Sequence, residues 1–444
     1  MSVRFVNIDR ETPMLLPPDL REWVREDDLA HFVLEAMETV PSDLAAINHR
    51  GSGSEQYPPG MMMALLLYCY ASGIFSSRRI EAATHRHVSV RYIAGNTHPD
   101  HDTIANFRRV NKELVRGSFV RVLELARELG LLQLGSVVVD GTKVWANAAK
   151  RATLSAAQVE KQLGFLEQQA EELLTKAEAA DAQEPNEGDC LPRELADRAQ
   201  RRARLEAARL ALEEKAQERT RAAVKERERA QREGCERGHP VPTPQVRASD
   251  QVNTTDPQSA LQPTAREGFI QGYNAQAAVS AQSGLIVAAH VVSDTGDRRQ
   301  LAPTVGAIPL QLGRPQAIVA DTGYDNTAQI LEVERTTGAV VYCALQSPNT
   351  KRSASGRPPQ RKSRRRQLPG QLRQRMSERL QSAEGARLYR LRKTSIEPVF
   401  GIIKSVLGFR RFSLRGLDKV NLEWQLVSAA FNCRRLAARK ARRH

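Results

Sequence analysis

Residues 134–142 read LGSVVVDGT, a short apolar run that ends in Asp140 and a glycine. β-Branched side chains favour strands, and an Asp-Gly pair typically marks the exit from one. The same pattern recurs in residues 317–323, AIVADTG, where Asp321 follows the apolar run. We therefore predict two strands of an α/β sheet, each ending in a carboxylate at the rim of the sheet, which solvent and ligands can reach. Taken singly, each aspartate is better explained as a turn or helix-capping residue.

A third acidic residue, Glu397, favours a shared functional role for the two aspartates over separate turn or capping roles. Residues 389–404 read YRLRKTSIEPVFGIIK. If Ser395 caps a helix, Glu397 falls in the first turn and Pro398 at the third helical position, where its missing N–H would have had no partner. A continuous helix kinked at Pro398 is the alternative. Lys404 follows Glu397 by about two helical turns, so an acid and a base share one face. In most proteins this is surface electrostatics, but beside a metal ion it would hold phosphate.

The composition points to an anionic partner. The chain has 444 residues, of which 66 are Lys or Arg and 51 are Asp or Glu, for a net charge of +15. Such an excess favours binding to a phosphate-rich polymer. A hydrophobic content of 41% allows one large core or two to three domains.

Metal-ribbon, disulfide-rich and membrane classes fit the sequence poorly. The five cysteines are scattered without a Cys-x-x-Cys pair. Four histidines crowd one region, but no cysteine follows at ligand spacing and residues 100–103 are typical of a helix cap, so we do not favour zinc. The four are His85, His87, His98 and His101. The best apolar stretch, residues 61–70, is far below the ~20 residues that span a bilayer, so we expect a cytoplasmic protein.

The motifs together resemble the DDE class of bacterial insertion-sequence transposases, in which an RNase H-like catalytic core follows a helical N-terminal domain. The core matches are residues 139–142 (VDGT), 272–276 (GYNAQ) and 320–324 (ADTGY), and the series Tyr389, Arg392, Glu397 and Lys404. The upstream matches are residues 57–60 (YPPG), 76–79 (SSRR) and 98–104 (HPDHDTI). They occur in the family's order along nearly the whole chain, which makes the likeness far more specific than any one motif.

The resemblance implies a metal-dependent DNA phosphoryl transferase. Asp140, Asp321 and Glu397 would be the catalytic residues and would bind two Mg²⁺ or Mn²⁺ ions, which prefer hard oxygen ligands. The substrates would be the terminal inverted repeats of the element and a target duplex. A nucleoid-associated homodimer that bridges two element ends is also implied by resemblance. Two rivals remain open: an RNase H-like nuclease that cuts without joining, and a DNA-binding regulator without catalysis.

Further residues are candidates for contact with DNA. Tyr389, Arg392 and Lys404 would position phosphates, and Tyr324 would either stack on an unpaired base or pack at the end of its strand. Residues 351–376 hold ten Lys or Arg and no acid, including Arg364, Arg365 and Arg366. We predict that this run binds the DNA backbone, although charge runs are more often simply solvated.

Other polar residues have weaker assignments. Asn274 and Gln276 are expected to support the site or to form a buried hydrogen-bonded pair. Asp256 lacks the arginine that usually follows in the family, so we do not assign it to the site. In the N-terminal region, Arg78, Arg79, Arg86 and Arg91 suit either a helix-turn-helix reader of the element's ends or a solvated face of a helical bundle.

We predict an α/β fold with an RNase H-like mixed five-stranded sheet, an all-helical N-terminal domain and a helical-hairpin insertion. The helical N-terminal domain spans residues 1–130 and was expected to bind DNA ends. The predicted segments after it are the first part of the core (131–153), a charged helical insertion (154–233), an irregular connection (234–268), the continued core (269–346), a basic loop (347–384), and a C-terminal catalytic helix with a basic tail (385–444). Within the insertion, Leu163, Leu166, Leu205 and Leu212 follow helical spacing and predict an apolar seam.

Overall fold

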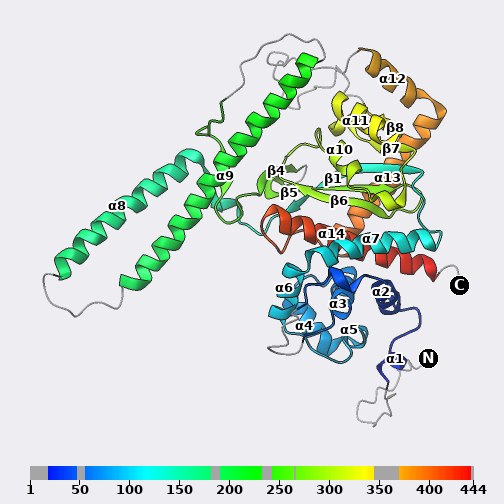
Figure 1. Ribbon diagram of the computed structural model, residues 1–444, viewed down its shortest axis with the longest axis horizontal. Coiled ribbons are helices and arrows are strands. Elements are labelled where there is room, and N and C mark those ends of the chain that lie inside the picture. The colour runs from blue at the N-terminus through cyan, green and yellow to red at the C-terminus, as the bar shows by residue number, and fades with distance from the viewer. Residues whose placement is uncertain are drawn as a thin grey trace, which may run out of the picture. The chain divides into compact units, whose positions relative to one another are not determined.

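The computed structural model describes residues 19–47, 56–181, 191–232, 243–264, 267–344 and 370–441 (Figure 1). The chain divides into two compact units: residues 1–125 with 429–444, and residues 126–428. Residues 351–369 of the predicted basic run, with Arg364, Arg365 and Arg366, lie outside the described residues, whereas its residues 370–376 belong to a helix, α12 (Gly370–Gln381). No described helix is long and apolar enough to cross a membrane.

The first unit is helical, as predicted. Its helices are α1 (Leu20–Trp23), α2 (Leu29–Glu38), α3 (Pro59–Ala71), α4 (Ser77–Arg86), α5 (Val88–Ile93), α6 (His101–Val110) and most of α7 (Lys112–Glu128). The apolar helix α3 is buried on nearly all sides and forms the centre of this core. The last turns of α14 (Leu417–Lys440) belong to the same unit, where Arg434 donates to the carbonyl of Ala71 and Lys440 pairs with Glu35 at 2.8 Å.

One predicted helix of this unit is divided in two. The helical spacing of the apolar residues from Ile104 to Phe119 predicts one long helix that begins at Asp102 or Thr103, but Asp100 caps α6 by accepting the Thr103 amide at 2.7 Å. The helix then ends at Asn111, whose side chain donates to the carbonyl of Phe107 and accepts the amide of Ala46. Because Ala46 is distant in the sequence, periodicity alone could not reveal this break.

The second unit contains a mixed sheet of six strands in the order β4-β5-β1-β7-β8, with β6 also paired to β5. The strands are β1 (Ser136–Trp145), β4 (Ala260–Thr264), β5 (Gly268–Ser280), β6 (Ile286–Val292), β7 (Ala317–Ala320) and β8 (Val340–Cys343). Strands β1, β7 and β8 are parallel, whereas β5 runs antiparallel to β1, β4 and β6. The apolar residues that predicted β1 and β7 are buried, as expected for central parallel strands.

The prediction of five strands was wrong by one, because β4 lies in the stretch expected to be an irregular connection. This strand contains Pro263, which cannot donate to a sheet and therefore argued against a strand. Strand β4 is at the edge of the sheet, where a proline is tolerated. A small second sheet pairs β2 (Thr153–Ser155) with β3 (Gln251–Asn253).

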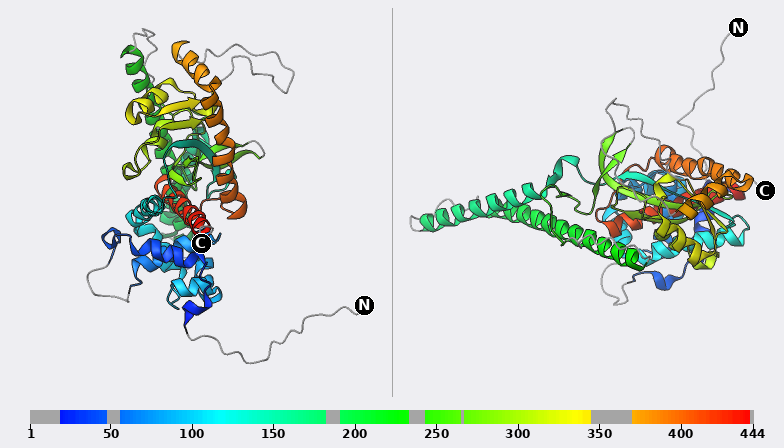
Figure 2. Two further views of the ribbon diagram at one scale, coloured as in Figure 1. Left: turned by 90° about the vertical axis from the view of Figure 1, so that its right-hand side faces the viewer. Right: turned by 90° about the horizontal axis from the view of Figure 1, so that it is seen from above.

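Two long helices, α8 (Ala156–Asp181) and α9 (Leu191–Arg232), run side by side (Figure 2). Their contact is the predicted apolar seam, in which Leu163 and Leu166 of α8 are buried with Leu205, Ala208 and Leu212 of α9. Charged residues cover the outer faces, so the pair is stabilised mainly by this narrow stripe.

Helix α13 (Ala383–Gly401) packs against β1, β7 and β8. Its N-cap is Ser382, whose hydroxyl accepts the Gly385 amide at 3.0 Å, so the predicted start at Ser395 is wrong and the continuous helix is correct. Ser395 is buried, and the apolar face of α13 continues through it. Pro398 lies inside the helix, and a π-helical turn (Ile402–Val406) follows directly, as is common where a helix must adapt locally.

The remaining helices of the second unit pack against the sheet. They are α10 (Leu301–Gly306), α11 (Thr327–Thr337), α12 (Gly370–Gln381) and the first part of α14. Trp424 of α14 is fully buried and its indole N–H donates to the carbonyl of Gln276 at 2.9 Å, which ties α14 to β5.

Candidate active site

Asp140, within β1, and Asp321, directly after β7, lie beside each other where β7 ends. Strands β1 and β7 are parallel neighbours in which Val139 is level with Ala320, so the aspartate that follows each one is brought beside the other. Asp140 accepts the amide of Gly141 at 2.8 Å, and Asp321 accepts the amide of Gly323 at 2.8 Å. The prediction that the first strand ends at Asp140 is wrong, because pairing with β5 extends β1 to Trp145. Only β7 ends directly before its aspartate, and the two acids form one acidic edge where β7 stops.

The electrostatics of this edge are unfavourable to two full negative charges. Burial, and then the neighbouring charge of Asp321, raise the pKa of Asp140 to about 7. Burial is also the main cause that raises the pKa of Asp321, with Asp297 adding to it. Hydrogen bonds from Gly141 and Gly323 lower these pKa values but do not offset the burial. The positive charge of Arg392 also lowers both pKa values without offsetting the burial, so a bound cation would further stabilise the ionised pair.

Arg392 is the cation that faces these carboxylates. One guanidinium nitrogen, Nη1, lies 3.6 Å from Oδ2 of Asp140, and the other, Nη2, lies 3.7 Å from Oε1 of Glu397. Arg392 thus stands between the two acids and links α13 to β1. The side chain of Glu397 is 51% exposed, compared with 18% for Asp140, so the third carboxylate lies at the outer side of the arginine.

The predicted phosphate-binding residues surround this group. Tyr389 is one turn before Arg392 on α13, and the guanidinium carbon of Arg392 lies 6.0 Å from the centre of its ring. Lys404, in the π-helical turn, donates to the carbonyl of Lys143 at 2.7 Å. Burial lowers the pKa of Lys404. The amine of Lys404 is therefore attached to β1, three residues beyond Asp140.

Of the two roles predicted for Tyr324, the structure favours packing at the end of its strand over stacking on an unpaired base. Its side chain is fully buried, and its hydroxyl donates to Oε1 of Gln276. No ring surface is left for a base. Asp256, which was left unassigned, is also buried; it accepts the hydroxyl of Tyr273 at 2.8 Å and the amide of Gly416 at 3.2 Å.

Asp297 is a member of this edge that the sequence analysis missed. Its Oδ1 accepts from the side-chain amides of Asn274 and Gln276, both at 2.7 Å, so these two residues do not form a pair with each other but hold a carboxylate. Asp297 also raises the pKa of both Asp140 and Asp321. A signal existed: β6 is antiparallel to β5 and hence runs parallel to β1, so the loop after β6 opens at the same edge.

Gly141 is required by this close packing. A Cβ atom there would lie 2.7 Å from Oδ1 of Asp297 and 2.8 Å from Oδ1 of Asn274, and still closer to the amide of Gln276. No side chain fits at this position, so the contacts themselves require the glycine; β1 continues through Asp140 and Gly141, which form no turn.

The described residues contain no group of three or more His, Cys, Asp or Glu close enough to hold a metal ion as they stand. Arg392 accounts for this at the acidic edge, since it lies between Asp140 and Glu397. The histidines of the first unit have other partners: His101 bonds Glu81 at 2.8 Å, and His98 bonds Thr84 at 3.0 Å and stacks on His85.

Two protein-family models match the chain. Residues 238–433 match a model described as Transposase DDE domain, and residues 18–110 match one described as Transposase domain (DUF772). The first match contains Asp321 and Glu397, whereas Asp140 lies outside both. No curated protein and no solved structure gives a significant match. Since both models describe transposases and they occur in the expected order, the chain belongs to the DDE transposases of insertion sequences and is a DNA phosphoryl transferase.

Proposed function

We propose that Asp140, Asp321 and Glu397 are the catalytic carboxylates with which this transposase cleaves the ends of its element and joins them to target DNA. The observation that supports the proposal is that Asp140 of β1 lies beside Asp321, which directly follows the parallel neighbour β7; burial raises the pKa of both acids, and the charge of Asp321 further raises that of Asp140. Such a costly arrangement of acids is expected where a site is built to bind cations.

DDE transposases generally use divalent metal ions, and the donor set at this edge is suited to them. Asp140 and Asp321 offer hard oxygen ligands from two adjacent strands, which favours Mg²⁺ or Mn²⁺. Glu397 would complete the set once Arg392 turns away from it. When bound, two such ions would stabilise the attacking and leaving oxygens of an in-line displacement at phosphorus.

The protein's own groups would prepare the reaction. The incoming phosphate competes with Glu397 for Arg392, because a guanidinium binds phosphate in the same bidentate way as carboxylate. Release of Glu397 would leave the three acids facing one another. Tyr389 and Lys404 lie beside Arg392 and would fix the same phosphate. Substrate binding would thereby assemble the site, which would keep the enzyme inactive without DNA.

We also propose an RNase H-like core and a division of the chain into the predicted segments. The order β5-β1-β7-β8, with β5 antiparallel and the others parallel, is compatible with an RNase H-like core. The predicted boundaries, with α8 and α9 as an insertion after residue 153, are proposed with it. The helical first unit would bind the terminal inverted repeats, and two subunits would bridge the two ends.

The test is cleavage and strand transfer on DNA that carries the element's ends, with Mg²⁺. Asp140→Asn, Asp321→Asn and Glu397→Gln are expected to lose both activities while DNA binding persists. Asp418→Asn, which changes an exposed carboxylate in the first turn of α14, is the matched control and should remain active. Cleaved but unjoined products from the native chain would indicate a nuclease, and specific binding without turnover would indicate a regulator.

A further inference from the structure

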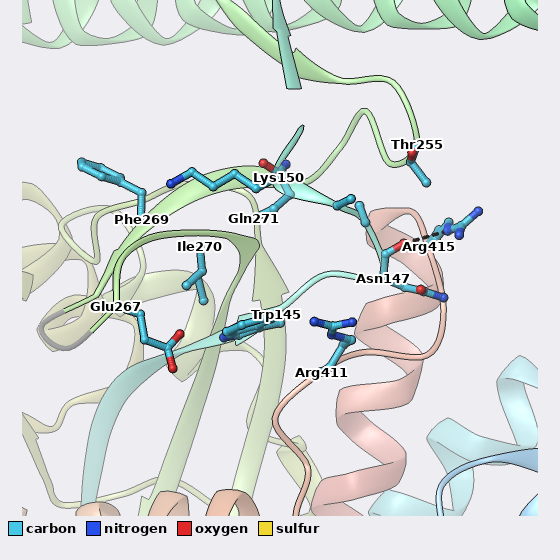
Figure 3. A pocket seen from close by; sticks show the side chains of 12 residues that line it. Trp145, Asn147, Lys150, Thr255, Glu267, Phe269, Ile270, Gln271, Arg411 and Arg415 are labelled. Carbon is cyan, nitrogen blue, oxygen red and sulfur yellow. Dashed lines mark hydrogen bonds between the residues drawn. The ribbon is translucent and has the colours of Figure 1, made fainter. Parts of the chain in front are cut away.

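A pocket of about 540 Å³ opens beyond the acidic edge, at the far end of β1 (Figure 3). Its wall includes two aromatic side chains, Trp145 and Phe269, and three cationic ones, Lys150, Arg411 and Arg415. Glu267 is its one acidic residue among the lining side chains. None of these residues has a role in the site described above.

The fold holds Trp145 firmly while leaving its ring accessible. Trp145 is the last residue of β1 and is bonded through its backbone to the segment after the π-helical turn: its amide donates to Arg410 at 3.0 Å and its carbonyl accepts from Phe412 at 2.9 Å. Its partner across the strand pair is Gly272, so no side chain lies directly opposite the indole.

The exposure of the two aromatic rings suggests a ligand. Trp145 is 37% exposed and Phe269 is 56% exposed, although large apolar side chains gathered in one hollow are normally covered. The guanidinium of Arg411 lies 4.9 Å from the centre of the Trp145 ring. Arg415 is fixed by a hydrogen bond from Nε to the carbonyl of Asn147 at 2.9 Å. Flat rings beside fixed guanidinium groups are the combination that binds single-stranded nucleic acid.

The pocket also has a polarity that suits a nucleotide. In Figure 3, Glu267 and Phe269 lie on one side of Trp145, and Arg411 and Arg415 lie on the other. A carboxylate repels phosphate but accepts the N–H groups of bases, whereas arginines attract phosphate. The base would therefore enter on the side of Phe269 and Glu267, with its phosphate toward the arginines.

The distance along β1 from Asp140 to the pocket allows one DNA strand to reach both. Trp145 follows Asp140 by five residues, which is roughly 17 Å along a strand that rises about 3.3 Å per residue. That is about five base steps of one DNA strand at ~3.4 Å each. Lys143 and Lys404, which is bonded to the carbonyl of Lys143, lie between the two points along β1 and provide positive charge on the way.

We propose that this pocket binds one unstacked base of a DNA strand that passes through the active site, with the base against Trp145 and Phe269 and the backbone against Arg411 and Arg415. The proposal rests on the proposed function, because it assumes that the DNA strand passes the catalytic carboxylates before it reaches the pocket. Its role is to hold the strand after the duplex opens at the site of cleavage.

The experiment measures binding of the full chain to a short single-stranded oligonucleotide and to its duplex, by fluorescence anisotropy. Loss of stacking on one ring costs roughly 1–3 kcal/mol, so Trp145→Leu should weaken single-strand binding about 5- to 150-fold. Duplex binding should change less than 3-fold, and Trp145→Phe should keep most of the affinity. Leu310→Ala, which removes a side chain that is 83% exposed elsewhere in the second unit, is the control.

A second variant guards against misfolding. Phe269 is more than half exposed, so Phe269→Ser should leave the fold intact and still weaken single-strand binding. Unchanged single-strand affinity in Phe269→Ser and in folded Trp145→Leu would overturn the proposal, as would an equal loss for duplex. The outcome is separable from the catalytic assignment, because Asp140→Asn is expected to abolish cleavage but to retain single-strand binding in this pocket.

Discussion

Replacement of Asp140 by Asn should stabilise the metal-free protein at alkaline pH. Burial and the charge of Asp321 raise the pKa of Asp140 from its ordinary value of 3.8 to about 7. A group whose pKa is higher in the folded state favours folding below its unfolded pKa, and that advantage is lost as the pH rises through the folded value. At 1.36 kcal/mol per pKa unit, the ionised carboxylate costs up to about 4 kcal/mol above pH 7, and asparagine carries no such charge.

The assay is urea denaturation in EDTA at pH 8 and at pH 4, followed by tryptophan fluorescence, to which the fully buried Trp424 contributes. Asp140→Asn should raise the free energy of unfolding by about 2–4 kcal/mol at pH 8, and the gain should nearly vanish at pH 4, where Asp140 is protonated when folded and partly so when unfolded. Asp418→Asn should show no gain at either pH. A variant that is less stable than the native chain at pH 8, or a difference that is the same at both pH values, would refute the reasoning.

Three further changes test neighbouring contacts. Gly141→Ala should destabilise the protein by about 1–3 kcal/mol, because its Cβ would overlap Asp297 and Asn274; calorimetry showing an unchanged melting temperature would contradict the packing. Arg392→Gln should lower kcat/KM for end cleavage about 10- to 150-fold, since a charge-assisted contact to phosphate contributes roughly 1.5–3 kcal/mol, and Arg392→Lys should not restore it; full activity in either variant would remove its role. Tyr324→Phe should cost about 1–2 kcal/mol of stability by leaving Gln276 without its donor; an unchanged free energy of unfolding in urea would contradict the role of this hydrogen bond.

The two strands that bear the aspartates could be predicted because their signal is local. An apolar run followed by Asp indicates a strand without knowledge of the rest of the chain, and the parallel pairing of β1 with β7 then places Asp140 beside Asp321. The predicted exit at Asp140-Gly141 is wrong, because pairing with β5 extends β1 to Trp145. The same local reasoning identified the seam between α8 and α9, because both helices show their apolar residues at helical spacing.

The errors arose where distant contacts decide the local structure. Ser395 has the form of a helix cap, but the burial of its side chain within α13 keeps the helix continuous. Strand β4 exists despite Pro263 because it lies at the edge of the sheet. Asp297 follows no apolar run directly, and only the β5–β6 hairpin carries it to Asn274 and Gln276. The sequence next to Ser395 and β4 carries no signal of these contacts, and the signal for Asp297 lies in the strand direction set by the β5–β6 hairpin.

The central claim is that Asp140, Asp321 and Glu397 bind hard divalent cations in the transferring complex. The most direct measurement replaces each by cysteine and compares end cleavage in Mg²⁺ with that in Mn²⁺, because a thiolate is a poor ligand for Mg²⁺ and a better one for the softer ion. We predict that each cysteine variant is inactive in Mg²⁺ and recovers part of its cleavage in Mn²⁺, whereas Asp418→Cys behaves as the native chain in both. Undiminished cleavage by the three variants in Mg²⁺ would contradict the claim.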